Sequence, residues 1–235
     1  LHASIMKFDI IILAGGLGTR LASVVNDVPK PMAPVAGKPF LDHILDALPL
    51  EHINSIILSV GHKSNKVIEY YGEFYKNIPV IYSIEQEPLG TGGGISLAMN
   101  HVTQNSALIL NGDTFFDVNF EEFWQTHQDC MTPITLALKQ MQFPDRYGTV
   151  LMEKNTLVKF QEKQKNIPTG LINGGSYWVN KDIIELLPKT EKYSFEKDFL
   201  EVSVSKKYLG GYISDGLFID IGIPEDYERA QQIFS

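Results

Sequence analysis

Short runs of apolar, largely β-branched residues divide the first half of the chain at regular intervals. Residues 8–13, 55–60, 79–82 and 106–110 each form such a run, bounded by Gly, Asn or Asp. Between these runs, residues 40–48, 67–74 and 95–99 carry apolar side chains at helical spacing. Strands that alternate with helices predict a parallel sheet covered by helices. We therefore expect ligands to bind beyond the carboxyl ends of these strands.

The pattern changes from residue 132 onward, where the predicted strands follow one another with little helix between them. These strands are residues 132–139, 148–152, 157–160 and 171–179, and they indicate an antiparallel or mixed extension of the sheet. Residues 180–187 and 195–204 favour helices, residues 217–221 a short strand, and residues 224–234 a closing helix with Pro224 in its first turn. The chain is thus predicted to be a single α/β domain over residues 6–235, a three-layer, Rossmann-like fold with a mixed, mainly parallel sheet.

Composition narrows the functional classes. The 235 residues are 44% hydrophobic and 20% charged, as in ordinary globular proteins. Because 28 Asp and Glu outnumber 20 Lys and Arg, the net charge of −8 argues against binding to nucleic acid or to a membrane surface. No run approaches the roughly 18 apolar residues of a membrane span, and the single cysteine, Cys130, fits a reducing compartment, so a cytoplasmic location is predicted. Residues 1–5 precede Met6, lack the features of a signal peptide, and are interpreted as a remnant of cloning.

Two motifs near the N-terminus suit phosphate chemistry. A glycine-rich loop with an arginine follows the first predicted strand, and it consists of Leu13, Ala14, Gly15, Gly16, Leu17, Gly18, Thr19 and Arg20. Glycines allow backbone N–H groups to approach anionic oxygens, and Arg20 can bind phosphate through two N–H groups, although a simple tight turn explains the glycines equally well. The loop matches neither the dinucleotide nor the P-loop fingerprint. Lys30 stands between Pro29 and Pro31, which fix the backbone and hold a cation ready for charge on an α-phosphate.

Candidate polar ligands follow later in the chain. The Asn111-Gly112-Asp113 segment follows the 106–110 strand and Asp220 ends another apolar stretch, and two convergent carboxylates suit Mg²⁺. Each aspartate taken alone is explained better by a turn at the end of a strand. Residues 87–94 place a proline and glycines at the entry to a helix, which predicts a helix N-terminus facing phosphate and close contact with a flat base. The side-chain amide of Asn173 suits vicinal hydroxyls, and a β-bulge in an edge strand is the alternative interpretation of residues 173–175. The six histidines show no metal-binding spacing.

Together these motifs resemble the signature of the sugar-1-phosphate nucleotidyltransferases. The resemblance extends over nearly the whole chain from residue 6, through residues 13–21, 29–32, 34–41, 87–93, 111–113, 162–163, 173–175 and 218–227. Within the family, residues 23–25, 31–35 and 219–227 are most similar to the guanylyltransferases that act on D-glycero-α-D-manno-heptose 1-phosphate. The resemblance implies the nucleotide-diphospho-sugar transferase fold.

The resemblance also implies a role for each matching residue. The catalytic residues would be Arg20, Lys30 and Asp113, and Asp113 and Asp220 would bind Mg²⁺. The nucleotide would contact Leu13, Ala14, Gly15, Gly16, Gly18, Thr19, Glu87, Gly90, Thr91, Gly92, Asn111 and Gly112. The sugar phosphate would contact Glu162, Lys163, Asn173, Gly174 and Glu196. Gln164 stands where the family has a proline, which leaves the turn after Lys163 open.

The reaction implied by the resemblance transfers GMP from GTP to a sugar 1-phosphate. With D-glycero-α-D-manno-heptose 1-phosphate the products would be GDP-heptose and pyrophosphate, for the synthesis of a capsule, a lipopolysaccharide or an S-layer glycan. A uridylyl- or thymidylyltransferase acting on a hexose or muramic-type 1-phosphate is the nearest alternative. A glycosyltransferase that uses residues 111–113 as its metal motif and a non-catalytic nucleotide-binding homologue are more distant alternatives. The expected partners are these two substrates, and a homo-oligomer is left open.

Overall fold

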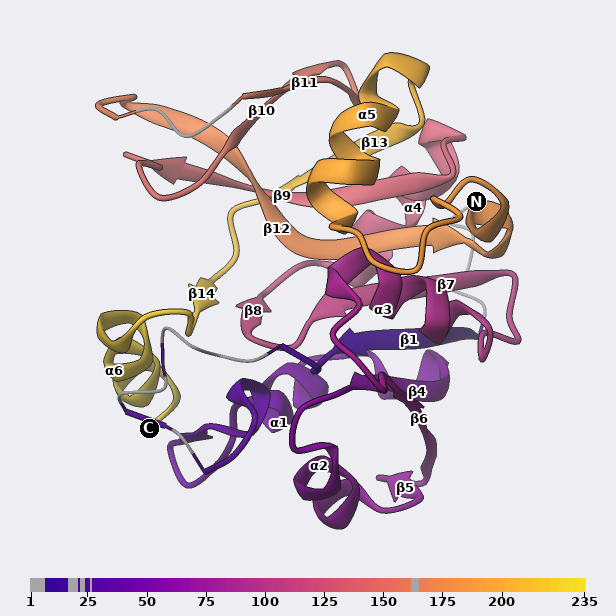
Figure 1. Ribbon diagram of the computed structural model, residues 1–235. Helices are drawn as coiled ribbons and strands as arrows, with labels where there is room; N and C mark the ends of the chain where they lie inside the picture. The colour runs from indigo at the N-terminus through magenta and orange to yellow at the C-terminus, as the bar shows by residue number, and fades with distance from the viewer. Residues whose placement is uncertain (1–6, 17–20, 22–23, 26, 162–164) are drawn as a thin grey trace.

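The computed structural model describes residues 7–16, 21, 24–25, 27–161 and 165–235, and the remnant predicted at residues 1–5 lies outside this set (Figure 1). Within it, one ten-stranded sheet has the order β10-β11-β13-β9-β12-β7-β1-β4-β6-β5. Its strands are β1 (Phe8–Leu13), β4 (Ile53–Val60), β5 (Phe74–Tyr75), β6 (Ile78–Ile84), β7 (Ser106–Asn111), β9 (Ile134–Gln142), β10 (Thr149–Glu153), β11 (Thr156–Gln161), β12 (Thr169–Asn180) and β13 (Leu209–Ser214).

The strand directions confirm a mixed, mainly parallel sheet. Strands β6, β4, β1 and β7 form an uninterrupted parallel block. Strand β12 then runs antiparallel to both β7 and β9, and β13 pairs parallel with β9. Strands β10 and β11 complete this edge as an antiparallel pair, which lies at the top of Figure 1. The antiparallel extension predicted after residue 132 is therefore present, with β12 joining it to the parallel block.

Helices cover both faces of the sheet. The longer ones are α1 (Phe40–Asp46), α2 (Ser64–Tyr71), α3 (Gly90–Met99), α4 (Phe120–Cys130) and α6 (Pro224–Phe234). Short helical turns are η1 (Lys30–Met32), η2 (Leu50–His52), η3 (Lys181–Glu185), η4 (Phe195–Leu200), α5 (Glu201–Ser203) and η5 (Val204–Lys206). Two small sheets pair β2 (Pro34–Val35) with β3 (Lys38–Pro39) and β8 (Thr114–Phe116) with β14 (Phe218–Asp220). No helix in the described ranges is long and apolar enough to cross a membrane.

Strand β1 shows how the sequence pattern builds this layered structure. Its side chains alternate between two buried cores, because successive residues of a strand point to opposite faces. Ile10 and Ile12 belong to the core that includes α1 and α6, whereas Ile11 belongs to the core that includes α3 and η4. A strand buried on both faces reads as a continuous apolar run, which is the pattern that predicted it.

Several predicted elements differ in the structure. The predicted 67–74 helix ends at Tyr71, since Gly72 takes a φ of +58° and the chain turns into β5. The 180–187 segment forms only the short turn η3, and the 195–204 segment is a π-helical turn followed by short helical pieces. Helix α4 and strands β8 and β13 were not predicted. The start of α4 could have been predicted from Asn119, which is its N-cap. The Asn119 side chain accepts hydrogen bonds from the backbone N–H groups of Glu121 and Glu122.

Candidate active site

The carboxyl ends of the parallel strands meet at one edge of the sheet, as predicted. Leu13, the last residue of β1, lies opposite Ser59 of β4 on one side and Asn111 of β7 on the other. The backbone N–H of Ala14 donates to the Ser59 carbonyl at 2.8 Å, which fixes the direction in which the chain leaves β1. The loop that contains Gly15 and the Asn111-Gly112-Asp113 segment therefore start side by side.

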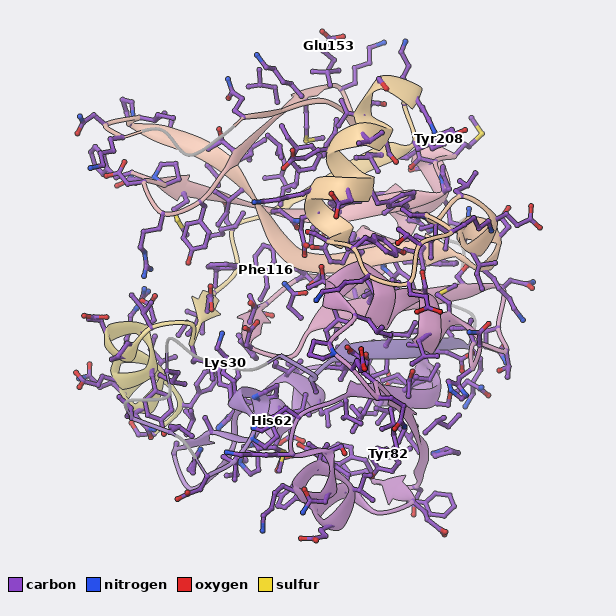
Figure 2. The ribbon with its side chains drawn as sticks, viewed as in Figure 1. Lys30, His62, Tyr82, Phe116, Glu153 and Tyr208 are labelled. Atoms are coloured by element: carbon purple, nitrogen blue, oxygen red, sulfur yellow. The ribbon has the colours of Figure 1, made fainter. Side chains whose placement is uncertain are left out.

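Lys30 and Asp113 form an ion pair at this edge. The Lys30 Nζ lies 2.5 Å from Asp113 Oδ2, and only 10% of the lysine side chain is exposed. Lys30 begins the turn η1, and Figure 2 shows it on the side of the molecule where β8 and β14 lie. The two predicted catalytic residues that lie in the described ranges are thus in direct contact. Asp113 therefore holds the Lys30 ammonium in place at this edge of the sheet.

Gly112 allows this close approach. Its backbone N–H donates to the Leu13 carbonyl at 3.0 Å. A Cβ atom at this position would lie 2.6 Å from the same carbonyl oxygen and 3.1 Å from Pro31. Any side chain here would push β1 and the Pro31 turn away from the end of β7. A small cavity of about 170 Å³ opens beside these residues, lined by Leu13, Gly16, Lys30, Pro31, Thr91, Asn111 and Asp113.

Asp220 reaches the same place from the other end of the chain. Strand β14 pairs with β8 so that Asp220 lies opposite Thr114, the residue after Asp113. The backbone N–H of Ile221 donates to the Asp113 carbonyl at 3.0 Å. Burial, together with the negative charge of Asp220 and a smaller contribution from Asp113, raises the pKa of nearby Tyr147 to about 12. The two predicted metal-binding carboxylates are therefore brought together.

The glycines at the start of α3 pack against the segment that precedes η4. A Cβ atom at Gly93 would lie 2.2 Å from the Glu191 carbonyl oxygen, and one at Gly90 would lie 2.5 Å from the Tyr193 carbonyl oxygen. The N–H of Gly92 donates to the Tyr193 carbonyl at 3.0 Å. These glycines are thus required by contacts within the protein. Since its N–H is already bonded, Gly92 can contact a ligand only through its other atoms.

Thr91 connects this glycine-rich turn to a residue predicted to bind the sugar. Its hydroxyl donates to Glu196 Oε2 at 2.8 Å and accepts from the backbone N–H of Phe195 at 2.9 Å. Ser194 also donates to Glu196 Oε2, at 3.1 Å. Glu196 is therefore oriented by two hydroxyls, one of which belongs to the predicted nucleotide-binding segment.

Glu85 is a residue of this site that the sequence reasoning missed. Glu87, which was predicted to contact the nucleotide, is exposed. The Glu85 carboxylate instead accepts from the Leu89 backbone N–H at 3.0 Å and from the Ser59 hydroxyl at 3.3 Å. Cβ atoms added at Gly15 or Gly94 would lie within 2.9 Å of it. Its position directly after β6, like that of Asp113 shortly after β7, was the available signal.

A larger cavity of about 670 Å³ lies next to the first. Its lining includes Asn111, Thr114, Tyr147, Gly148, Phe160, Gln161, Asn173, Gly174, Gly175, Tyr177, Glu196, Lys197, Glu201, Phe218 and Asp220. The predicted contacts Asn173, Gly174 and Glu196 are thus brought together here. Asn111 lines both cavities, and its buried side-chain oxygen finds no hydrogen-bond partner among the described residues. The two cavities therefore meet at a polar atom that a ligand could satisfy.

Asn173 is held in a bulge of β12. Its amide nitrogen donates to the Tyr177 hydroxyl at 2.9 Å, and its amide oxygen accepts from the Gly175 N–H at 3.0 Å. The register of β12 with β9 shifts between Asn173 and Tyr177. The alternative prediction of a bulge is confirmed, but β12 pairs with strands on both sides and is not the predicted edge strand. The bulge places the amide at the cavity wall.

Five predicted contacts lie outside the described residues and stay predictions: Gly18, Thr19, Arg20, Glu162 and Lys163.

Comparisons with known proteins cover almost the entire chain. A family described as "Nucleotidyl transferase" matches residues 9–234. The D-glycero-alpha-D-manno-heptose 1-phosphate guanylyltransferase of Aneurinibacillus thermoaerophilus is 47% identical over 224 residues, which are 95% of this chain and 97% of that protein. The protein of the same name from Campylobacter jejuni is 46% identical and covers 92% of this chain and 96% of its own length. The crystal structure of HddC from Yersinia pseudotuberculosis complexed with GMP-PN has a TM-score of 0.84 and 36% identity, covering 97% of this chain and 100% of that chain.

Proposed function

Because the chain belongs to the nucleotidyl transferase family, we propose that it transfers GMP from GTP to D-glycero-α-D-manno-heptose 1-phosphate. Two relatives with that printed activity, 47% and 46% identical to this chain, support the choice of substrates. The observation that carries the proposal is the ion pair of Lys30 and Asp113, which lines the smaller of two cavities that share Asn111. The smaller cavity, beside the glycine-rich turns, would take the triphosphate, and the larger one would take the sugar.

The reaction needs a cation and exact alignment more than it needs a base. An oxygen of the sugar 1-phosphate forms a bond to the α-phosphorus of GTP, the bond from that phosphorus to the bridging oxygen breaks, and pyrophosphate leaves. The attacking phosphate is already ionised near neutral pH, so no proton has to be removed. Lys30 would neutralise charge that develops on the α-phosphate, and Asp113 keeps the ammonium in position before the substrates arrive.

Asp113 and Asp220 fit a Mg²⁺ ion, which we include in the proposal. This ion binds to one or two carboxylates together with waters and substrate phosphates. Lys30 contacts only Oδ2 of Asp113, and the pairing of β14 with β8 supplies the second carboxylate. Bound there, the ion would neutralise phosphate charge. The described residues contain no group of three or more His, Cys, Asp or Glu that could hold a metal by themselves, so substrate oxygens would have to complete the coordination.

Replacing Asp113 tests the proposal most directly. We expect Asp113→Asn to lower the rate of pyrophosphate release from GTP and the heptose 1-phosphate by about 10²–10³-fold, since it removes one charge from the metal and loosens Lys30. The melting temperature should fall modestly, because the largely buried Lys30 ammonium loses its carboxylate partner, and circular dichroism checks that the fold is retained. Asp182→Asn, an exposed aspartate of η3, is the matched control. Release near the wild-type rate in Asp113→Asn would overturn the assignment.

A substrate matrix separates the transfer reaction from its specificity. GTP, UTP, dTTP, CTP and ATP are each combined with several sugar 1-phosphates, and pyrophosphate release is measured. We expect GTP with the manno-configured heptose 1-phosphate to give the highest kcat/KM. Preference for UTP or dTTP with a hexose 1-phosphate would overturn the proposed substrates but leave nucleotidyl transfer intact.

A further inference from the structure

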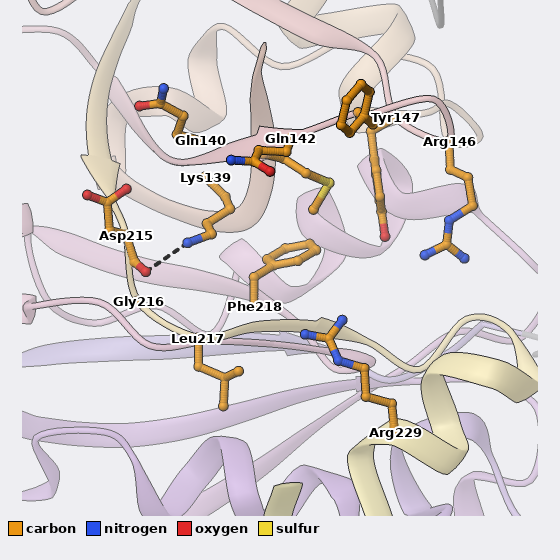
Figure 3. Close-up of a pocket in the computed structure, with 12 residues that line it drawn as sticks. Lys139, Gln140, Gln142, Arg146, Tyr147, Asp215, Gly216, Leu217, Phe218 and Arg229 are labelled. Atoms are coloured by element: carbon orange, nitrogen blue, oxygen red, sulfur yellow. Dashed lines mark hydrogen bonds between the residues drawn. The ribbon is translucent and has the colours of Figure 1, made fainter. Parts of the chain in front are cut away.

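A third cavity of about 450 Å³ lies behind the wall of the larger, substrate cavity (Figure 3). Tyr147 and Phe218 line both of these cavities, with ring centroids 6.0 Å apart. None of the sequence motifs that predicted the active site contributes a charged residue to this third cavity. The active-site motifs therefore do not account for the charged residues of this cavity.

Three cations line this cavity, and they come from three different elements. Lys139 extends from β9, Arg146 from the loop that follows β9, and Arg229 from α6, as Figure 3 shows. Asp215 supplies the lining's one carboxylate among the residues that the structure describes. A local excess of positive charge stands out in a chain whose net charge is −8.

Acceptor groups of the protein compensate these three cations only in part. The half-buried Lys139 donates to the backbone carbonyl oxygen of Asp215 at 2.7 Å, and no carboxylate of the described chain lies within ion-pair distance of its Nζ. Arg229 makes no hydrogen bond or ion pair with any residue that the structure describes. Arg146 binds Asp226 through one nitrogen at 2.6 Å, which leaves most of its N–H donors for another partner. The cavity is thus rich in donors that lack acceptors.

We propose that this cavity binds a phosphorylated small molecule in addition to the two substrates, with Lys139, Arg146 and Arg229 as its ligands. A phosphate group presents several charged oxygens at once, so it can accept from two guanidinium groups and an ammonium that approach from different sides. The side-chain amide of Gln142 lines the same cavity and can donate further. A single carboxylate has too few oxygens to satisfy all these donors.

Titration with inorganic phosphate, followed by backbone amide NMR at constant ionic strength, tests the proposal. We expect the amides of Gln142 and Gly216, which line this cavity and not the substrate cavity, to shift and to saturate. Phosphate can also bind between the catalytic residues, and the amides of Gly15 and Gly16 report that site separately. Saturation at these two glycines with no change at Gln142 and Gly216 would overturn the proposal.

Two variants show whether the cations cause the shifts. Arg229→Gln on the exposed face of α6 and Lys139→Gln should each weaken the phosphate affinity measured at Gln142 and Gly216 by roughly tenfold, while the response of Gly15 and Gly16 stays unchanged. Lys206→Gln, which removes a cation from the ring of Tyr208, is the control. Shifts that persist unchanged in both test variants, or that disappear equally in the control, would show a general charge effect and contradict a built site.

Discussion

On the proposed nucleotide side of the site, which comprises residues 13–16, 85–94 and 111–112, main chain packs directly against main chain. On the proposed sugar side, along β12 and η4, hydrogen bonds hold the side chains in place. Gly93 and Gly112 have no space for a Cβ atom, because a backbone carbonyl oxygen occupies it. Asn173 and Glu196 are instead oriented by hydroxyls and N–H groups. The nucleotide side should therefore tolerate almost no change in shape, and the sugar side should be adjustable by single side chains.

A methyl group added on the nucleotide side should have the largest effect. The Cβ of Gly93→Ala would lie 2.2 Å from the Glu191 carbonyl oxygen and 2.6 Å from Leu89 Cβ, and neither atom can move alone. We expect a loss of about 1–3 kcal/mol in the free energy of unfolding and a large rise in the KM for GTP. Denaturant unfolding and steady-state kinetics measure the two effects.

Gly16→Ala is the matched control for stability. A Cβ at Gly16 meets no atom of the described residues within 4 Å, so this variant should change the free energy of unfolding by less than about 0.5 kcal/mol. Equal stability losses in the two variants would contradict the steric explanation.

Thr91 is the hydrogen-bonded link between the two sides, and removing it should have an intermediate effect. Thr91→Val keeps the shape but loses the donor to Glu196 and the acceptor for the Phe195 N–H. We expect stability to fall by about 1 kcal/mol, and the KM for the sugar phosphate to rise more than the KM for GTP. Thr91→Ser should restore both values. If Thr91→Ser behaves like Thr91→Val, the hydroxyl does not form the link.

The contrast between main-chain packing and side-chain contacts also explains which features could be predicted from the sequence. Strand β1 and the loop after it were predictable, because a continuous apolar run followed by glycines has few other structures. The meeting of Asp113 with Asp220 followed from a family resemblance, since the β8–β14 pairing that causes it joins strands of only three residues. The family resemblance named Glu87 and no pattern drew attention to Glu85, because only the packing of Gly15 and Gly94 in the folded chain brings the Glu85 carboxylate into the site. The cations of the third cavity come from β9 with the loop after it and from α6, more than 80 residues later, and form no motif.

The smallest expected effect concerns His127, which lies where the parallel block joins the antiparallel extension. Its ring contacts the Thr135 hydroxyl of β9 and the Asn180 side chain at the end of β12, and burial lowers its pKa to about 4, although the Asn180 contact opposes this shift. The folded protein therefore holds His127 neutral, whereas in the unfolded chain it titrates near its usual pKa of about 6.5. Below that value the unfolded state binds the extra proton, so stability is full above pH 6.5 and is lost as the pH falls toward 4.

Between pH 7 and pH 6 this linkage should reduce the free energy of unfolding by less than about 1 kcal/mol. Urea unfolding at closely spaced pH values measures the slope. His127→Asn should flatten it, whereas His62→Asn, at an exposed histidine, should leave it unchanged. If the free energy of unfolding depends on pH with the same slope in the wild type and in His127→Asn, protonation of His127 does not destabilise the junction between the parallel block and the antiparallel extension. The buried hydrogen bonds of His127 would then contribute to packing alone.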